Sequence, residues 1–428
     1  MKLRLLFVLL LTCSLSFAQT AVLTETASPE SEGVSSTALA QIDEHIKAYI
    51  ADGKVPGGAF LIAKGGKVIY EKQFGYRTSK QETPYAEDDI YRIASMTKAI
   101  TCVAVMQLWE QKKIGLNDPV YKYIPAFKNQ VVLDEFNSAD SSYTTIPVEK
   151  AVTVRNLLTH TSGIVYGSFN PGKLMAVYEQ FDMNVGFSHD QWSTEEWINR
   201  LAKVPLAHQP GAQWSYGLNM DVLGRIVEVA SGMPLDQYFQ KNIFDKAGMT
   251  DSHFYLPKGK FDRLAPVYTK VQGKLITLDE LGMAGQASYP MEGPRNIFAG
   301  GAGLSATTKD YARFIQKLVD GGGDLLGSAA LKEMTTDQKP KVLTNYDPNG
   351  GQPNGSFCLG FTLYQDKSSN TSPKSPGTYE WGGYFNTKFF IDPAEEMIFV
   401  GMTQIVPFQD NAFWEDMYKL IYASIQSN

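Results

Sequence analysis

Hydrophobic residues recur with two different periods along this chain, and the periods predict where helices and strands lie. Residues 35–54 place apolar side chains at helical spacing, at Leu39, Ile42, Ile46 and Ile50. Two runs with strand character follow, GGAFLIAK and KVIYEKQFG, and the Gly65-Gly66 pair between them is typical of a hairpin turn. Near the far end, FCLGFTLY, TYEWGG, TKFFID and EMIFVGMT predict successive short strands before a last helix.

The middle of the chain carries a different pattern. From about residue 91 to about residue 312, helical segments such as KAITCVAVMQLWEQ and MDVLGRIVEVASG alternate with polar or aromatic loops. Segments 138–145 and 345–355 are rich in turn-forming residues and are predicted to be surface loops. We therefore predict a two-part α+β fold, of α/β character overall. An antiparallel sheet from both chain ends, about residues 30–90 and 313–428, is flanked by terminal helices and carries a large, mostly helical insertion.

The first 18 residues have the features of a secretory signal peptide. Lys2 and Arg4 precede an apolar run that ends in Ser16-Phe17-Ala18. Cleavage after Ala18 would leave residues 19–428 as a single domain in the periplasm or outside the cell. Lipidation at Cys13, within Leu-Leu-Thr-Cys, is the alternative. No later segment approaches about 20 consecutive apolar residues, so we expect no integral membrane segment in the mature protein.

Composition narrows the classes of function. The chain has 428 residues, 43% hydrophobic and 20% charged, with a net charge of −6 and no Lys/Arg-rich block, which argues against nucleic-acid binding. Its five histidines lack metal-ligand spacing, and H-E-x-x-H and C-x-x-C are missing from the sequence, so we expect neither a metal nor an organic cofactor. Cys102 and Cys358 are expected to be unpaired buried thiols.

Candidate chemistry begins at Ser95 and Lys98, at the start of the predicted helix KAITCVAVMQLWEQ. The two side chains lie one turn apart on the same helix face, within reach of a hydrogen bond. A serine hydroxyl needs a neighbouring base to become a nucleophile, and a helix start adds backbone N–H groups. A helix-capping serine beside a solvated lysine would show the same spacing.

Two further motifs add to this pair. Tyr216 follows a Pro-Gly turn at the junction of a loop and a helix, where its phenol is expected either to face a cleft or to pack. The sequence Glu380-Trp381-Gly382-Gly383-Tyr384 ends a predicted strand. Paired glycines permit the close backbone approach that an oxyanion hole or a substrate-binding edge requires, although a plain hairpin would also use them.

Jointly, these motifs resemble the serine β-lactamase and penicillin-binding-protein-like family, on its class C side. The tracts VRNLLTHTSG at 154–163 and GGAGLS at 300–305 belong to the same pattern, which runs from about residue 35 to the C-terminus. The resemblance implies an acyl-enzyme mechanism in which Ser95 is the nucleophile and Lys98 and Tyr216 move its proton. It also implies an oxyanion hole from the backbone N–H groups of Ser95 and Tyr384, and a structural role for the turn at 159–163.

Departures from the family pattern bear on the substrate. Penicillin-active members usually carry Tyr-x-Asn, but Leu218 stands at the amide position, and Trp381 replaces the usual Lys or His of the third motif. The substrate-binding positions implied are Trp381, Gly382, Gly383 and Leu218, as in the esterase branch of the family. Stretch 164–192 is expected either to wall an acyl pocket or to pack on itself, through Tyr166, Phe169, Tyr178, Phe181, Phe187 and Trp192.

The main hypothesis from the sequence is an exported serine hydrolase that cleaves carboxylic esters or small amides through an acyl-Ser95 intermediate. Its partner is a small-molecule substrate. One alternative is a D,D-peptidase or β-lactamase that acts on acyl-D-alanine or β-lactams. The other is a non-catalytic binding module with the same fold.

Overall fold

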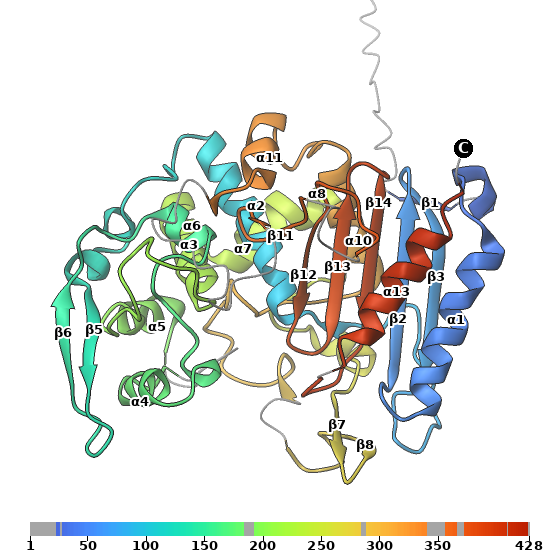
Figure 1. Cartoon of the computed structure of the whole chain (residues 1–428), viewed down its shortest axis with the longest axis horizontal. Helices are drawn as coiled ribbons and strands as arrows, with labels where there is room; N and C mark the ends of the chain where they lie inside the picture. The colour runs from blue at the N-terminus through green and yellow to red at the C-terminus, as the bar shows by residue number, and fades with distance from the viewer. Residues whose placement is uncertain are drawn as a thin grey trace, which may run out of the picture.

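The computed structural model of the chain describes residues 23–25, 28–183, 192–283, 288–339, 356–365, 372–408 and 410–426 (Figure 1). The predicted signal peptide, Cys13, Phe187 and the predicted loop 345–355 lie outside the described residues.

Both ends of the chain contribute strands to one eight-stranded sheet. Its order is β1-β3-β2-β14-β13-β12-β11-β10. The pairing of β1 with β3 is parallel, and the other pairings in this sheet are antiparallel. The predicted hairpin is confirmed as β2 and β3, and the N-terminal β2 pairs with the C-terminal β14 at the centre of the sheet. The strands are β1 (Thr24–Glu25), β2 (Gly57–Lys64), β3 (Lys67–Gly75), β10 (Ser356–Phe357), β11 (Thr362–Leu363), β12 (Tyr379–Gly383), β13 (Thr387–Asp392) and β14 (Met397–Met402).

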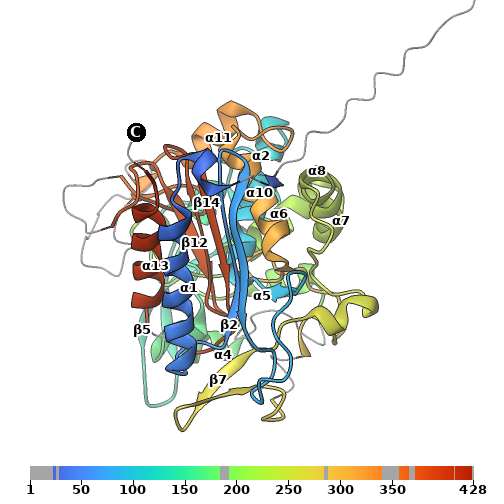
Figure 2. The ribbon, with the colours of Figure 1, turned by 90° about the vertical axis from the view of Figure 1, so that its right-hand side faces the viewer.

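Alternation along β2 explains the layers on the two faces of the sheet. Phe60 and Ile62 belong to the core beneath α1 (Ser36–Ala51) and α13 (Ala412–Ala423), whereas Leu61 and Ala63 belong to the larger core on the other face. That face is covered by α10 (Thr308–Val319) and the insertion, so helices lie on both sides of the sheet (Figure 2). Burial on both faces accounts for the continuous apolar runs that the strands show in sequence.

Most of the insertion is helical, as predicted. Its central helix is α2, which is buried on nearly all sides and packs against α6, and a helix that is apolar all round belongs in a core. The helices of this part are α2 (Thr97–Glu110), α3 (Val154–Leu158), α4 (Lys173–Gln180), α5 (Thr194–Leu201), α6 (Asn219–Ser231), α7 (Leu235–Phe239) and α8 (Asp245–Ala247), and α11 (Ser328–Thr335) follows α10.

Small two-stranded sheets interrupt the helices of the insertion, a feature that the sequence did not predict. They pair β4 (Tyr91–Arg92) with β9 (Ser305–Ala306), β5 (Val131–Phe136) with β6 (Tyr143–Pro147), and β7 (Tyr268–Val271) with β8 (Lys274–Thr277). The predicted loop 138–145 therefore runs from a hairpin turn into β6. Two-stranded ribbons are short and half exposed, and their periodicity is too brief to stand out from loop sequence.

The run FCLGFTLY is not one strand. It forms β10 and β11 around a turn in which the Cys358 N–H donates to the Phe361 carbonyl at 3.0 Å. Gly360 provides the turn, because its φ of +87° lies in the left-handed region that favours glycine. Cys102 and Cys358 are both free and buried, which confirms that expectation. None of the helices in the described ranges is both long and apolar enough to span a bilayer.

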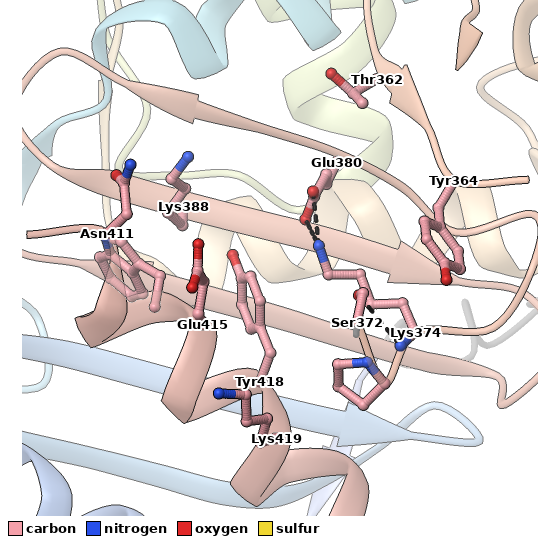
Figure 3. A pocket seen from close by; sticks show the side chains of 12 residues that line it. Thr362, Tyr364, Ser372, Lys374, Glu380, Lys388, Asn411, Glu415, Tyr418 and Lys419 are labelled. Atoms are coloured by element: carbon pink, nitrogen blue, oxygen red, sulfur yellow. Dashed lines mark hydrogen bonds and ion pairs between the residues drawn. The ribbon is translucent and has the colours of Figure 1, made fainter. Parts of the chain in front are cut away.

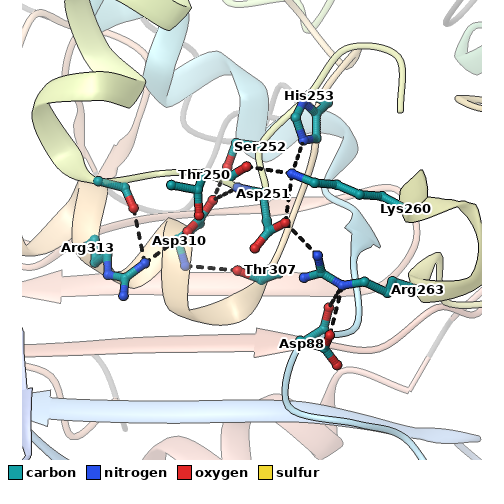
Figure 4. Close-up of polar contacts among 11 residues, drawn as sticks. Asp88, Thr250, Asp251, Ser252, His253, Lys260, Arg263, Thr307, Asp310 and Arg313 are labelled. Atoms are coloured by element: carbon teal, nitrogen blue, oxygen red, sulfur yellow. Dashed lines mark hydrogen bonds and ion pairs between the residues drawn. The ribbon is translucent and has the colours of Figure 1, made fainter. Parts of the chain in front are cut away.

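A group of ion pairs fixes the segment after α8 to the 3-10 helix Lys258–Arg263 (Figure 4). The Asp251 carboxylate accepts from Arg263 at 2.7 Å and pairs with Lys260 at 2.9 Å, and the Lys260 ammonium also lies 3.0 Å from His253 Nε2. Partial burial opposes ionisation, but the bonds from Arg263 and Lys260 outweigh it and lower the pKa of Asp251 to about 2.

Replacing Asp251 with Asn should destabilise the protein in a pH-dependent way. The folded pKa lies below the unfolded value of about 3.9, so the stabilisation is present above about pH 5 and declines as the pH falls toward 2. We expect Asp251→Asn to lower the free energy of unfolding by about 1–2 kcal/mol at pH 7 and by less at pH 3.5, measured by urea denaturation. The control is Asp88→Asn, whose more exposed carboxylate also pairs with Arg263 and should change stability by less than about 0.5 kcal/mol. If Asp251→Asn lowers the free energy of unfolding equally at pH 7 and pH 3.5, the stabilisation does not come from the ionised Asp251 carboxylate.

Candidate active site

Ser95 lies in a short 3-10 helix, η2 (Ala94–Met96), between β4 and α2. The preceding residue, Ala94, has a φ of +43°, which is unfavourable for a residue with a Cβ atom. Buried contacts hold this turn on both sides: the Ile93 N–H donates to the Leu304 carbonyl at 3.0 Å, and β4 pairs with β9. Strained backbone of this kind is often kept at functional sites, where it fixes the position of one side chain.

The structure brings together the three side chains that the sequence singled out. The Lys98 Nζ donates to the Ser95 Oγ at 3.1 Å, and the Tyr216 hydroxyl donates to the same oxygen at 2.7 Å. Ser95 and Tyr216 are partly exposed, whereas Lys98 is 0% exposed. A partly accessible hydroxyl therefore contacts a phenol and a fully enclosed amine.

Lys98 has two further partners, Tyr166 and Gly301. Its Nζ atom donates to the Tyr166 hydroxyl at 3.2 Å and to the Gly301 carbonyl at 2.7 Å. A carbonyl can only accept, so one N–H of Lys98 always points at Gly301. The other two directions face hydroxyls, which can donate or accept. The amine can therefore take a proton from the Ser95 hydroxyl without losing its anchor.

Tyr166 contacts Lys98, a role that the sequence analysis did not predict for it. It was grouped with the aromatic stretch 164–192, and nothing in its neighbouring sequence indicates a contact with Lys98. Burial, together with the charge of Asp221 and the nearby Tyr216, holds the pKa of Tyr166 well above its usual value, so it is a neutral phenol at neutral pH.

The rest of that stretch divides between the two predicted roles. Phe169 is 54% exposed and stacks on the exposed Tyr384, with ring centroids 6.2 Å apart, at the end of β12. Tyr178 instead packs inside the protein, and its hydroxyl accepts from the Val165 N–H at 2.9 Å. Part of the stretch therefore lies beside the site and part packs on itself.

Gly217 explains how Tyr166 reaches the site. A Cβ atom at this position would collide with the Ile164 carbonyl and lie 2.5 Å from the Val165 Cα. The absence of a side chain lets the two segments touch, and the Tyr166 N–H donates to the Tyr216 carbonyl at 3.3 Å. The glycine after Tyr216 thus places the second tyrosine next to Lys98.

Leu218 does not have the place that the sequence predicted. Its side chain is buried in the main core at the start of α6, so a direct contact with substrate is not supported. The next residue, Asn219, is also buried: its amide contacts His160 Nδ1 at 2.9 Å, and its Oδ1 accepts from the Ser162 hydroxyl. Asn219 therefore fastens the turn at 159–163 to α6, in keeping with the structural role expected for that turn.

The two glycines of β12 face opposite sides, because side chains alternate along a strand. A Cβ atom on Gly383 would strike the Ile93 carbonyl, so this glycine lets the strand end lie against the turn that carries Ser95. Gly382 instead faces Lys388, whose Cδ would be 2.8 Å from such a Cβ atom. Gly382 thus makes room for the Lys388 stem, and its predicted substrate contact is not supported.

Lys388 lines a polar cavity of about 410 Å³ between the sheet and α13 (Figure 3). Glu380, Lys374 and Tyr418 also line it, and Lys374 pairs with both oxygens of Glu380 at 2.6 and 2.7 Å. This cavity lies on the face of β12 opposite Trp381 and Gly383.

Aromatic rings surround Tyr216. Its ring centroid lies 4.9 Å from His160, 5.2 Å from Tyr166, 5.6 Å from Trp381 and 6.1 Å from Trp214. Trp381 thus packs beside Tyr216 and presents a ring at the position where the family resemblance leads us to expect Lys or His. Within the described ranges, no cluster of three or more His, Cys, Asp or Glu residues could hold a metal ion.

Comparisons with known proteins identify the family of the chain. The beta-lactamase family model matches residues 42–422, so the chain belongs to the beta-lactamase family and is related to its serine hydrolases. It is 26% identical to the esterase EstB of Burkholderia gladioli, over 83% of this chain and 87% of that protein. It is 30% identical to an Escherichia coli K12 protein provisionally assigned as a D-alanyl-D-alanine carboxypeptidase, over 92% of this chain and 88% of that protein. The solved structure of simvastatin synthase LovD from Aspergillus terreus superposes with a TM-score of 0.76 at 25% identity, covering 91% of this chain and 99% of that one.

Removing the Tyr166 hydroxyl should slow the reaction of Ser95 without unfolding the protein. Tyr166→Phe keeps the ring but leaves Lys98 with one hydrogen-bond partner fewer, and we expect the rate of Ser95 modification by a fluorophosphonate to fall about tenfold. Tyr178→Phe is the matched control, because it removes a buried hydroxyl from the same stretch without touching Lys98. Equal rates for the two variants would show that Tyr166 only packs.

Proposed function

We propose that the protein is an exported serine hydrolase that cleaves carboxylic esters through an acyl-Ser95 intermediate. The observation that carries the proposal is the Ser95 hydroxyl, hydrogen-bonded both to the Tyr216 phenol and to the enclosed Lys98 amine. The similarity to the esterase EstB supports an ester substrate. Export rests on the signal-peptide pattern at the N-terminus.

The proposed reaction uses these side chains in two half-reactions. The Ser95 Oγ attacks the ester carbonyl carbon, and its proton passes to Lys98, directly or through Tyr216. The tetrahedral intermediate then breaks its bond to the leaving alkoxide, which takes that proton and departs as the alcohol. Water attacks the acyl-enzyme with the same groups as base, releasing the carboxylic acid and restoring Ser95.

Two backbone N–H groups would stabilise the negative charge that forms on the carbonyl oxygen in the tetrahedral intermediate. Ser95 supplies one at the start of η2, and Tyr384 supplies the other where β12 ends against that turn. The close approach of Gly383 to Ile93 supports this arrangement, because it sets the strand end beside the nucleophile.

The surroundings favour apolar or aryl esters over substrates that carry a carboxylate. Trp381 packs against Tyr216, and the stacked pair of Phe169 and Tyr384 exposes further aromatic surface at the end of β12. The similarity to the Escherichia coli protein supports peptidase action on acyl-D-alanine as the second candidate. A non-catalytic binding module is disfavoured, because it would have no use for a buried amine directed at a serine hydroxyl.

The first test is hydrolysis of a short-chain chromogenic aryl ester. We expect Ser95→Ala to reduce the rate to background and Lys98→Met to reduce it at least about a hundredfold, since methionine fills the space but cannot take a proton. Lys388→Met is the matched control, because it removes a partly buried lysine of β13 that faces the polar cavity on the other side of the sheet. Wild-type activity that survives in Ser95→Ala would refute the proposed nucleophile.

The second test distinguishes an ester hydrolase from a peptidase that acts on acyl-D-alanine. If Trp381 disfavours substrates that carry a carboxylate, Trp381→Lys should raise the rate of acylation by a β-lactam relative to ester hydrolysis by about tenfold. Acylation by a labelled penicillin is followed by mass spectrometry beside the ester assay. An unchanged ratio would remove Trp381 as the determinant, and fast turnover of penicillin by the wild type would favour the second candidate.

A further inference from the structure

Asp221 is a buried carboxylate close to the proposed base and has no part in the mechanism above. It lies in the first turn of α6 and is 1% exposed. Its Oδ1 accepts from the Gly301 N–H at 2.9 Å, and the carbonyl of the same residue accepts from Lys98 at 2.7 Å. A single glycine thus connects the Asp221 carboxylate to the Lys98 amine.

The backbone at Gly300 and Gly301 is held rigidly between two helices. The Thr101 hydroxyl of α2 donates to the Gly300 carbonyl at 2.6 Å. On the side of α6, a Cβ atom on Gly300 would lie 2.6 Å from the Met220 carbonyl, and one on Gly301 would lie 2.5 Å from the Asp221 Oδ2. This close packing explains the glycine pair in GGAGLS and fixes the distance between Asp221 and Lys98.

We propose that Asp221 is a positioning residue that holds Lys98 through Gly301 and balances the positive charge that Lys98 carries after it takes the Ser95 proton. The inference rests on the proposed function, because it assigns a role within the same reaction.

Two physical effects support this role. The Gly301 N–H that Asp221 holds and the Gly301 carbonyl that accepts from Lys98 flank the same Cα atom, so the carboxylate fixes the position of the residue that anchors Lys98. In addition, transfer of the Ser95 proton to Lys98 leaves a positive charge on an enclosed amine, which is costly without a counter-charge. The second oxygen of Asp221, Oδ2, has no hydrogen-bond partner within the described ranges, so its charge is not neutralised by another donor.

The charge of Asp221 can be removed by pH as well as by substitution. Burial raises the pKa of Asp221 to about 6, against the opposing effects of Lys98 and the Gly301 N–H. Lys98 faces the carboxylate from α2, and Tyr166, whose phenol is neutral at these pH values, faces it from the segment before the 3-10 helix η5 (Gly167–Phe169). The side chain is therefore mostly ionised at pH 8 and mostly neutral at pH 5.

The experiment compares wild type with Asp221→Asn, which keeps the shape and an acceptor for the Gly301 N–H but carries no charge. The readout is the second-order rate constant for a fluorophosphonate, in which a bond forms from the Ser95 Oγ to phosphorus, fluoride leaves, and Lys98 takes the serine proton. The matched control is Asp310→Asn. Asp310 is also a buried carboxylate, but it accepts from the Ser252 hydroxyl and the Asp251 N–H in the ion-pair region of Figure 4.

We expect wild type to react at least about tenfold faster than Asp221→Asn at pH 8, and within about twofold of it at pH 5, where both side chains are neutral. Asp310→Asn should give a wild-type-to-variant ratio that does not change with pH. If the wild-type-to-variant ratio for Asp221→Asn is also the same at pH 8 and pH 5, the inference is overturned and Asp221 has only a structural role. Should Asp221→Asn fail to fold, as judged by thermal unfolding, Asp221→Ser takes its place.

The proposed function can fail separately. A wild type that carries no label at Ser95 would overturn the proposed nucleophile and this inference together. If the wild type is labelled at Ser95, but the rate constants of wild type and Asp221→Asn depend on pH in the same way, only the role of Asp221 is overturned.

Discussion

The burial of the Lys98 amine is the constraint on which the site depends. An amine removed from water is stable only where hydrogen-bond partners replace the water. One acceptor lies on the preceding turn, but Tyr166 and Gly301 come from segments 68 and 203 residues away in sequence. Each approach requires a backbone without a side chain, at Gly217 for the first and at Gly300 and Gly301 for the second. The glycines of the insertion and the enclosed lysine therefore belong to one packing arrangement.

Around this polar centre the protein places rings rather than charges. Trp381, Trp214 and His160 pack about Tyr216, so the phenol that contacts Ser95 is held by rigid neighbours. Leu218 lies in the core, so its effect on recognition is indirect. A leucine at this position leaves the site without the amide group that penicillin-active members usually carry there. In the proposed mechanism, the chain keeps the proton-transfer groups that the family resemblance implies, and the side chains packed around Tyr216 are aromatic rather than charged.

The sequence predicted what local patterns can specify. The hairpin at Gly65-Gly66, the terminal helices and the one-turn spacing of Ser95 and Lys98 all follow from short-range periodicity. Tyr216 was found through its Pro-Gly turn and its place in the family pattern. The contact of Tyr166 with Lys98 and the place of Asp221 were not predicted, because a lone tyrosine or aspartate has no pattern of its own and reaches Lys98 only through tertiary packing. Gly382 and Gly383 could not be told apart, since the side that each glycine faces depends on the register of β12.

The pairing of β2 with β14 at the middle of the sheet has a consequence for how the chain is made. Partners more than 300 residues apart close the sheet, so β2 has no neighbour on one side until the last segments have been synthesised. Before that point the hairpin presents an open apolar edge, the kind of surface on which chains associate with one another. A product cut short before residue 397 would keep this edge permanently, even though its Ser95 and Lys98 are intact.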